Sequence, residues 1–275
     1  ITAVGTSVFT NLDISGDVDV DGTLETDNLT VGGAQGTDGQ VLTSTGSGVG
    51  WEDAAGGVTF KAFGTSSIMV GDDATGTISA ANYNTGLGVD VFAALTSGDN
   101  NVAVGYNAGA GITTGTLNTF IGGLAGDATT TASDNTGVGA ASMGGNTTGT
   151  RNTALGSDSL KVSTEGNDNT AIGKGSLAAN TTASNNTAVG KNSLTANTTG
   201  AQNTAVGQGA GESNTTGVSL VALGRQALEA NTEGDFNTAL GQRALFKNTT
   251  SDDNTAVGNQ ALGENTTGAR NTAVG

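Results

Sequence analysis

Residues 186–202 read NTAVGKNSLTANTTGAQ, and residues 254–270 read NTAVGNQALGENTTGAR. Counting places from the Asn that begins each 17-residue unit, Gly stands at the fifth place of every unit from Gly71 to Gly275, and an aliphatic residue always precedes it. A short period without insertions is typical of one small structural unit stacked on its own copies. The sequence therefore predicts a rod built from residues 67–275, with twelve repeats and a partial one.

Composition limits the kind of core that such a rod can have. The chain of 275 residues contains 47 Gly, no Pro, no Cys and no His, and 35% of its residues are hydrophobic. A globular domain usually has about 45–50% apolar residues, so we expect no large core. Disordered low-complexity chains do not keep an aliphatic residue in register over two hundred positions, so we expect the array to be folded.

The charge and the polarity of the chain argue against several classes of partner. The net charge is −16 at pH 7, which disfavours binding to nucleic acid or to an anionic lipid surface. No apolar stretch approaches the ~18–20 residues that cross a bilayer, so we expect no membrane insertion. The chain begins at Ile1 without a Met or a cationic leader and stops in mid-repeat, so we expect it to be part of a longer protein. The absence of Cys fits a protein that works outside cells.

The first 66 residues follow other patterns. Apolar residues alternate with Asp from Leu12 to Leu24, which predicts a strand with one covered face in a segment of fibre-shaft strands over residues 1–35. Residues 40–42 and 49–51 flank a Gly-Ser-Gly turn, which predicts a hairpin. We expect Trp51 to anchor a small β-knob, with its connector, over residues 36–66.

A calcium-loop motif in this region is incomplete. Asp17, Asp19, Asp21 and Gly22 match its opening, but the twelfth place is Asn28 instead of a bidentate Glu, and no helical pattern flanks it. We therefore favour a strand with an acidic outer face and predict no metal site and no cofactor.

Each unit of the array reads as one coil of a parallel β-solenoid (β-roll), so the predicted fold class is all-β. The first five residues suit a short strand whose fourth, aliphatic side chain points into the coil. A pair such as Ser193–Leu194 predicts a second inward-facing strand, and NTTG predicts a turn, because Asn and Gly tolerate positive φ. The NTT triplets at Asn180, Asn197 and Asn265 also match N-glycosylation acceptors, which we expect to be unmodified.

Stacking at about 4.8 Å would place identical side chains above one another and give a rod of roughly 60 Å. Asn recurs at the first place from Asn84 to Asn271 with one break at Leu220, and Thr recurs at the thirteenth place from Thr96 to Thr266. Stacked Asn amides can hydrogen-bond in a ladder, which would fix the register of the coils.

The thin core of such a coil favours association of several chains. Each coil has only about two sizeable aliphatic residues, worth roughly 1.5–3 kcal/mol each when buried, against the ordering cost of 17 backbones. The small residues at the third, fifth and eighth places suggest narrow faces that let subunits approach closely. We therefore expect a parallel homo-oligomer with an apolar axis; a monomeric solenoid is the alternative.

Two resemblances add to this interpretation. Residues 188–193 (AVGKNS), 171–176 (AIGKGS) and 219–224 (SLVALG) resemble the head repeats of trimeric autotransporter adhesins. That resemblance implies left-handed parallel β-rolls joined in a homotrimer, although the period of 17 is longer than usual in that family. Residues 12–24 and the segment GQVLTSTGSG at 39–48 resemble the shaft and knob pieces of tail fibres from marine phages.

Without His or Cys the chain lacks the residues of a Ser-His-Asp triad, a thiolate nucleophile or an ordinary zinc site, so we predict a non-enzyme with no catalytic residues. Three functions remain. The first is a trimeric phage tail fibre shaft in the virion, a spacer and host-surface adhesin that contacts other tail proteins and a host glycan or protein receptor. The second is a bacterial trimeric surface adhesin or extracellular filament. The third is an ice-binding β-solenoid, suggested by the Thr rows at the second and thirteenth places.

The variable sixth, seventh, tenth and eleventh places hold most of the cations of the array. They include Lys174, Lys191, Arg225 and Arg243. If the shaft itself touches glycans, these exposed turns are where contacts could vary without disturbing the coil.

Overall fold

The computed structural model describes residues 81–275 in full and, before them, the backbone of six strands within residues 30–70. The chain divides into two units, Ile1–Gly57 and Val58–Gly275, each of which is described by itself. The predicted segment boundaries at residues 35 and 66 stay predictions.

Four short strands lie in the first unit. β1 (Thr30–Val31) pairs antiparallel with β2 (Ala34–Gln35), and β3 (Gln40–Ser44) pairs antiparallel with β4 (Val49–Asp53). The second pair confirms the predicted hairpin. The knob itself stays a prediction, and both the Leu12–Leu24 strand and the calcium-loop motif lie outside the described residues.

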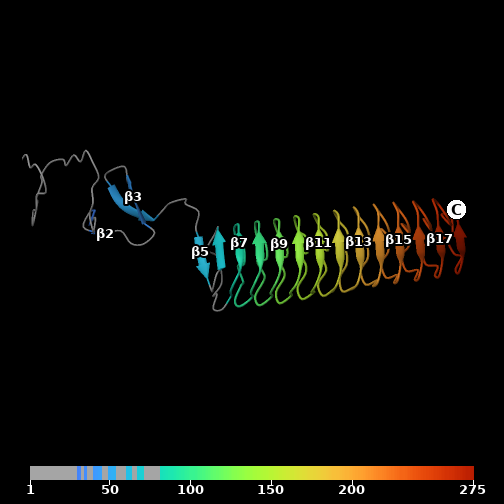
Figure 1. Ribbon diagram of the computed structural model, residues 1–275, viewed down its shortest axis with the longest axis horizontal. Coiled ribbons are helices and arrows are strands. Elements are labelled where there is room, and N and C mark those ends of the chain that lie inside the picture. The colour runs from blue at the N-terminus through green and yellow to red at the C-terminus, as the bar shows by residue number, and fades with distance from the viewer. Residues whose placement is uncertain are drawn as a thin grey trace, which may run out of the picture. The chain divides into compact units, whose positions relative to one another are not determined.

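The second unit is a parallel β-solenoid of 17-residue coils, as predicted, and about 11 coils of it are described (Figure 1). One sheet of 14 strands runs along it; β5 (Phe60–Phe63) is antiparallel to β6 (Ser67–Val70), and every later strand is parallel to its neighbours. The described part of the chain contains no helix. The three-residue strands that follow are β7 (Thr85–Leu87), β8 (Val102–Val104), β9 (Thr119–Ile121), β10 (Thr136–Val138), β11 (Thr153–Leu155), β12 (Thr170–Ile172), β13 (Thr187–Val189), β14 (Thr204–Val206), β15 (Val221–Leu223), β16 (Thr238–Leu240), β17 (Thr255–Val257) and β18 (Thr272–Val274).

The aliphatic fourth place does not point into the coil, so this part of the prediction was wrong. In β14 the third residue, Ala205, is 1% exposed, whereas the fourth, Val206, is 39% exposed. Successive side chains of a strand point to opposite faces, so only one of the two can face inward. The third place takes the interior, and in most coils it is an Ala that packs in one core cluster with the ninth-place side chains.

In residues 81–275 the predicted second strand is also absent, although its Leu does face inward. Leu194 is fully buried, but its φ is 50° and that of Asn192 is 57°, so the segment turns twice within three residues. The same alternation recurs in the other coils. One coil is therefore a short strand followed by turns, and Leu at the ninth place supplies most of the apolar volume inside it.

Volume inside the coils is conserved between neighbours. Phe120 occupies a third place that is usually Ala, and the ninth place of its coil is Gly126, where a Cβ atom would lie 2.5 Å from the Phe120 ring. Gly211 likewise faces Leu194, whose Cδ2 would lie 2.9 Å from an added Cβ. At these two places a large side chain is matched by Gly in the same or the adjacent coil, as close packing requires.

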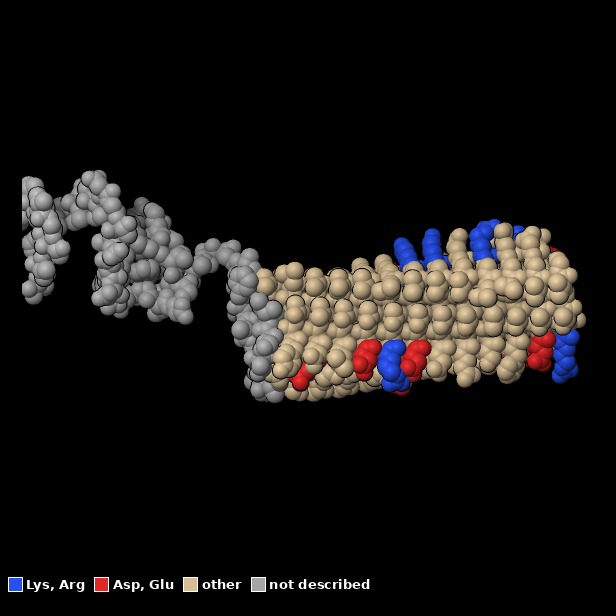
Figure 2. Space-filling view, viewed as in Figure 1, with Lys and Arg blue, Asp and Glu red and all other residues tan. Residues whose placement is uncertain are grey.

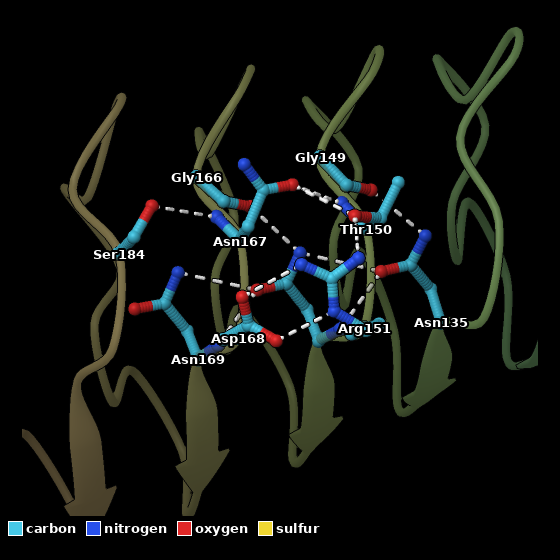
Figure 3. A network of polar contacts seen from close by, with 10 residues as sticks. Asn135, Gly149, Thr150, Arg151, Gly166, Asn167, Asp168, Asn169 and Ser184 are labelled. Atoms are coloured by element: carbon cyan, nitrogen blue, oxygen red, sulfur yellow. Dashed lines mark hydrogen bonds and ion pairs between the residues drawn. The ribbon is translucent and has the colours of Figure 1, made fainter.

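The predicted Asn ladder at the first place is confirmed (Figure 3). The backbone N–H of Asn152 donates to Oδ1 of Asn135 at 3.0 Å, its Nδ2 donates to the Gly166 carbonyl at 2.7 Å, and its Oδ1 accepts from the N–H of Asn169 at 2.9 Å. These Asn side chains are buried from Asn84 to Asn254. Each rung ties three successive coils together.

A second Asn ladder lies at the twelfth place, where only a turn was predicted. Asn214 donates to Oδ1 of Asn197 at 2.8 Å and to the Gly217 carbonyl at 3.0 Å. Positive φ falls on the fifth, seventh, ninth and seventeenth places instead, so the physical reason given for the turn was wrong. Asn180 and Asn197 are fully buried, which leaves these glycosylation triplets inaccessible in the folded chain.

The fifth-place glycines form a column of touching backbones. Gly190 has a φ of +133°, and a Cβ atom there would lie 2.5 Å from the carbonyl oxygen of Gly207 in the next coil. The same geometry recurs along the array. Two effects exclude a residue with a side chain here: the positive φ is strained for an L-residue, and its Cβ atom would collide with the backbone of the next coil.

Candidate functional site

Among residues 81–275 no group of His, Cys, Asp and Glu is arranged to hold a metal ion. Nor does this part contain a helix long and apolar enough to cross a membrane. The candidate sites are therefore surfaces of the rod. Three surfaces stand out, and their side chains differ in charge and polarity.

The first surface is the aliphatic row, which we define as the fourth-place side chains from Leu87 to Val274. They stack one per coil on the outer face of the sheet because the parallel strands pair in strict register. The half-exposed Thr side chains of the second place run beside them. Seven members are at least 36% exposed: Leu87, Ile121, Leu155, Ile172, Val206, Leu240 and Val274. Single exposed aliphatic residues are ordinary, but a row of them along one face is a candidate interaction surface.

The second surface is the cationic edge, formed by Lys174, Lys191, Arg225 and Arg243 at the sixth and seventh places. The N–H of each seventh residue donates to the sixth carbonyl of the preceding coil, for example Arg243 N to Arg225 O at 3.0 Å, so these residues follow one another along one edge of the sheet. Figure 2 shows Lys and Arg side chains gathered there. In the first coils the same edge carries the exposed Val89, Tyr106 and Leu124.

The third surface lies at the opposite end of the strands, at the sixteenth and seventeenth places (Figure 3). Arg151 binds Asp168 of the next coil through two hydrogen bonds, Nε to Oδ1 at 2.7 Å and Nη2 to Oδ2 at 2.8 Å. Beside it, the Thr150 N–H donates to Oδ1 of Asn167 at 2.7 Å. The hydrogen bonds from Arg151 and its charge hold the pKa of the Asp168 carboxyl below its ordinary value of 3.8.

Replacing Arg151 by Gln is expected to return the pKa of Asp168 toward 3.8, because both the bidentate donor and the positive charge are lost. Since the folded pKa is depressed, the pair stabilises the fold above the unfolded pKa, and this stabilisation is lost as the pH falls through the folded value. An NMR titration of the side-chain carboxyl carbon measures the shift. Both groups are exposed, so the urea midpoint at pH 7 should hardly change; an unchanged titration of Asp168 would contradict the assigned cause.

No protein-family model, no curated protein and no solved structure matches the chain. The sequence located the variable edges correctly, since Lys174, Lys191 and Arg225 are exposed as expected. It placed the small residues of the third and eighth places on an outer face, which was wrong. The predicted narrow face of small residues lies inside the coil, where Ala188 and Ser193 are fully buried, and the aliphatic row takes its place outside.

Proposed function

We propose that the chain is the shaft of a trimeric fibre, of the phage tail fibre type, that spaces and attaches the particle at a host surface. The observation that carries the proposal is the aliphatic row, which continues from β7 to β18 with one residue per coil. A partner that covers it along its whole length needs the same rise per coil. A second copy of the chain, parallel and in register, has that rise by construction.

The number of chains and the phage setting rest on the resemblances. Head repeats of trimeric adhesins suggest three chains around one axis, and the segments at residues 12–24 and 39–48 suggest a tail fibre. Three rows meeting at an axis would give a narrow apolar core between chains. That core would supplement the thin one within each chain.

Thr side chains give the ice-binding alternative less support. Hydroxyls of the thirteenth place donate to the next coil's carbonyl, as Thr198 Oγ1 does to Thr215 O at 3.0 Å, so their hydrogens are used within the rod. The row at the second place is interrupted by Val102 and Val221 and lies beside the aliphatic row. A thermal-hysteresis measurement distinguishes this function from that of a fibre.

Val206→Cys tests the association. The chain has no native Cys, so each protomer of the variant carries one thiol. In a trimer with the aliphatic rows at its axis, mild oxidation should give disulfide-linked dimers, because the Cα atoms of a disulfide lie within about 7 Å of each other. Gln242→Cys, on an exposed turn, is the matched control and should stay unlinked.

Sedimentation of the unmodified chain provides a second readout. A mass of three times the 26.6 kDa protomer is expected, and a single-chain mass would overturn the proposal. Antibodies against residues 81–275 should then decorate the tails of the encoding phage in electron micrographs. Decoration of a bacterial surface would instead favour the bacterial adhesin.

A further inference from the structure

The cationic edge concentrates the unpaired positive charge of the described array. Eight Lys and Arg side chains lie within residues 81–275, and four of them form ion pairs: Arg151, Lys161, Lys247 and Arg270. The remaining four are the members of the cationic edge, and no ion pair joins any of them to an acid. In a chain of net charge −16, the edge thus gathers four cations in one strip, where one acid, Asp158 at the seventh place of the coil before Lys174, interacts electrostatically with Lys174.

Folding alone does not explain the strip. Gln208 and Gln242 occupy sixth places in the same column, so a coil forms equally well with a neutral residue there. Side chains of like charge on neighbouring coils, about 4.8 Å apart, repel one another. The strip is therefore better suited to an external ligand than to stabilising the rod.

We propose that the cationic edge binds an extended acidic polysaccharide that lies parallel to the rod axis. Four cations spread over about 19 Å match a polymer that carries one carboxylate or sulfate on every one or two sugar units. The inference deepens the proposed function, because it names the chemistry of the surface that the fibre would contact.

A hollow of about 140 Å³ lies at the end of this edge and suits a sugar unit. It is lined by Arg243, Phe246, Gln260, Gly263 and Glu264. The Arg243 guanidinium carbon lies 4.0 Å from the centre of the Phe246 ring, which holds the cation at the rim of the hollow. Amide and carboxylate groups there can bond sugar hydroxyls while Arg243 binds the acidic group.

Two further carboxylates, besides Asp158, weaken the attraction of the strip for anions. Glu212 accepts a hydrogen bond from Nδ2 of Asn192 at 3.3 Å, and Glu229 lies at the same tenth place of the next coil with one oxygen buried. Their charges oppose a dense polyanion. Nucleic acid is less well suited than a polysaccharide, because its phosphates are closely spaced and single strands need exposed aromatic platforms, whereas Phe246 is covered by Arg243.

The test measures binding of the whole chain to polygalacturonate and to dextran sulfate, with neutral dextran and single-stranded DNA as comparisons. The edge variant carries Lys174→Gln, Lys191→Gln, Arg225→Gln and Arg243→Gln. The matched control carries Arg151→Glu and Arg270→Glu, which lowers the net charge by the same amount elsewhere and leaves the Lys161–Asp158 and Lys247–Glu264 ion pairs beside the edge intact. We expect the edge variant to lose on the order of tenfold or more in affinity and the control to change little.

Glu212→Gln gives an independent test. Removing a carboxylate that repels the polymer should strengthen the binding of both acidic polysaccharides, and the affinity should depend less on how many acidic groups each polymer carries. Of the two acidic probes, the one bound more tightly identifies carboxylate or sulfate as the recognised group. The proposal is overturned if the edge variant and its matched control lose affinity equally, if neither acidic polymer binds, or if DNA binds as tightly as the acidic polysaccharides. Sedimentation measures the oligomeric state separately from polysaccharide binding. A monomer that still binds the polysaccharide through the cationic edge would overturn the proposed trimeric fibre and leave the proposed binding site standing.

Discussion

Replacing Gly190 by Ala should lower the free energy of unfolding by about 3–5 kcal/mol. An L-residue at a φ of +133° is strained by itself, and the added Cβ would lie 2.5 Å from the carbonyl oxygen of Gly207. Neither term relaxes easily, because the two backbones belong to adjacent coils held in register on both sides. The midpoint of urea unfolding, followed by circular dichroism, measures the loss.

Gly175→Asn is the matched control. Gly175 also has positive φ, +69°, but it lies at the seventh place, where Asn192 adopts 57° in the next coil. The nearest atom to an added Cβ is the side-chain oxygen of Asn192, which can move. This variant should cost less than about 1 kcal/mol. Equal losses for Gly190→Ala and Gly175→Asn would show that backbone stacking is not the reason for the glycine column.

Asn152→Ala is expected to cost about 3 kcal/mol. The side chain is 1% exposed, and its removal leaves the N–H of Asn169 and the carbonyl of Gly166 without the partners that they have at 2.9 and 2.7 Å. Each buried polar group that loses its hydrogen bond costs about 1–3 kcal/mol. The shift in the urea midpoint is again the measurement, and hydrogen exchange at the Asn169 amide locates the defect.

Asn259→Ala controls for the loss of an amide as such. Asn259 lies at an exposed sixth place, so its substitution should leave stability within about 0.5 kcal/mol of the unmodified chain. If Asn152→Ala were as mild as Asn259→Ala, the buried ladder would contribute little to stability. Leu220 shows how the structure accommodates one interruption of the Asn ladder. The N–H of Leu220 still donates to Oδ1 of Asn203 at 2.9 Å, and the Leu220 side chain is buried.

The stacking of the coils could be predicted because the sequence repeats every 17 residues without an insertion. A fixed spacing of 17 residues determines which side chains stack, so the ladder of Asn152 and its copies followed from position alone. The orientation of the Val189 side chain could not be predicted in this way, because an aliphatic residue is equally suited to a core and to an exposed face that a second chain covers. Only the structure shows that the Ala188 side chain faces the interior. The width of that interior depends on the side chains of the whole coil.

The turns were harder to predict for a different reason. Asn197 belongs to a residue type that favours turns, and a single sequence does not distinguish an Asn that makes a turn from one whose amide is buried in a ladder. Leu194 at a φ of 50° runs against the preference of its residue type. Its conformation is fixed by burial and by the hydrogen bond of its N–H to Ala210 O in the next coil at 3.0 Å.

Because each rung joins a coil to the next through the same atoms, any two coils of the array present compatible ends. Removing residues 186–202 would bring Asn203 directly beyond Asn169, the same kind of neighbour that it already has. Duplication or loss of whole units in the gene would therefore alter the reach of the rod in steps of about 4.8 Å while the Asn ladder stays in register.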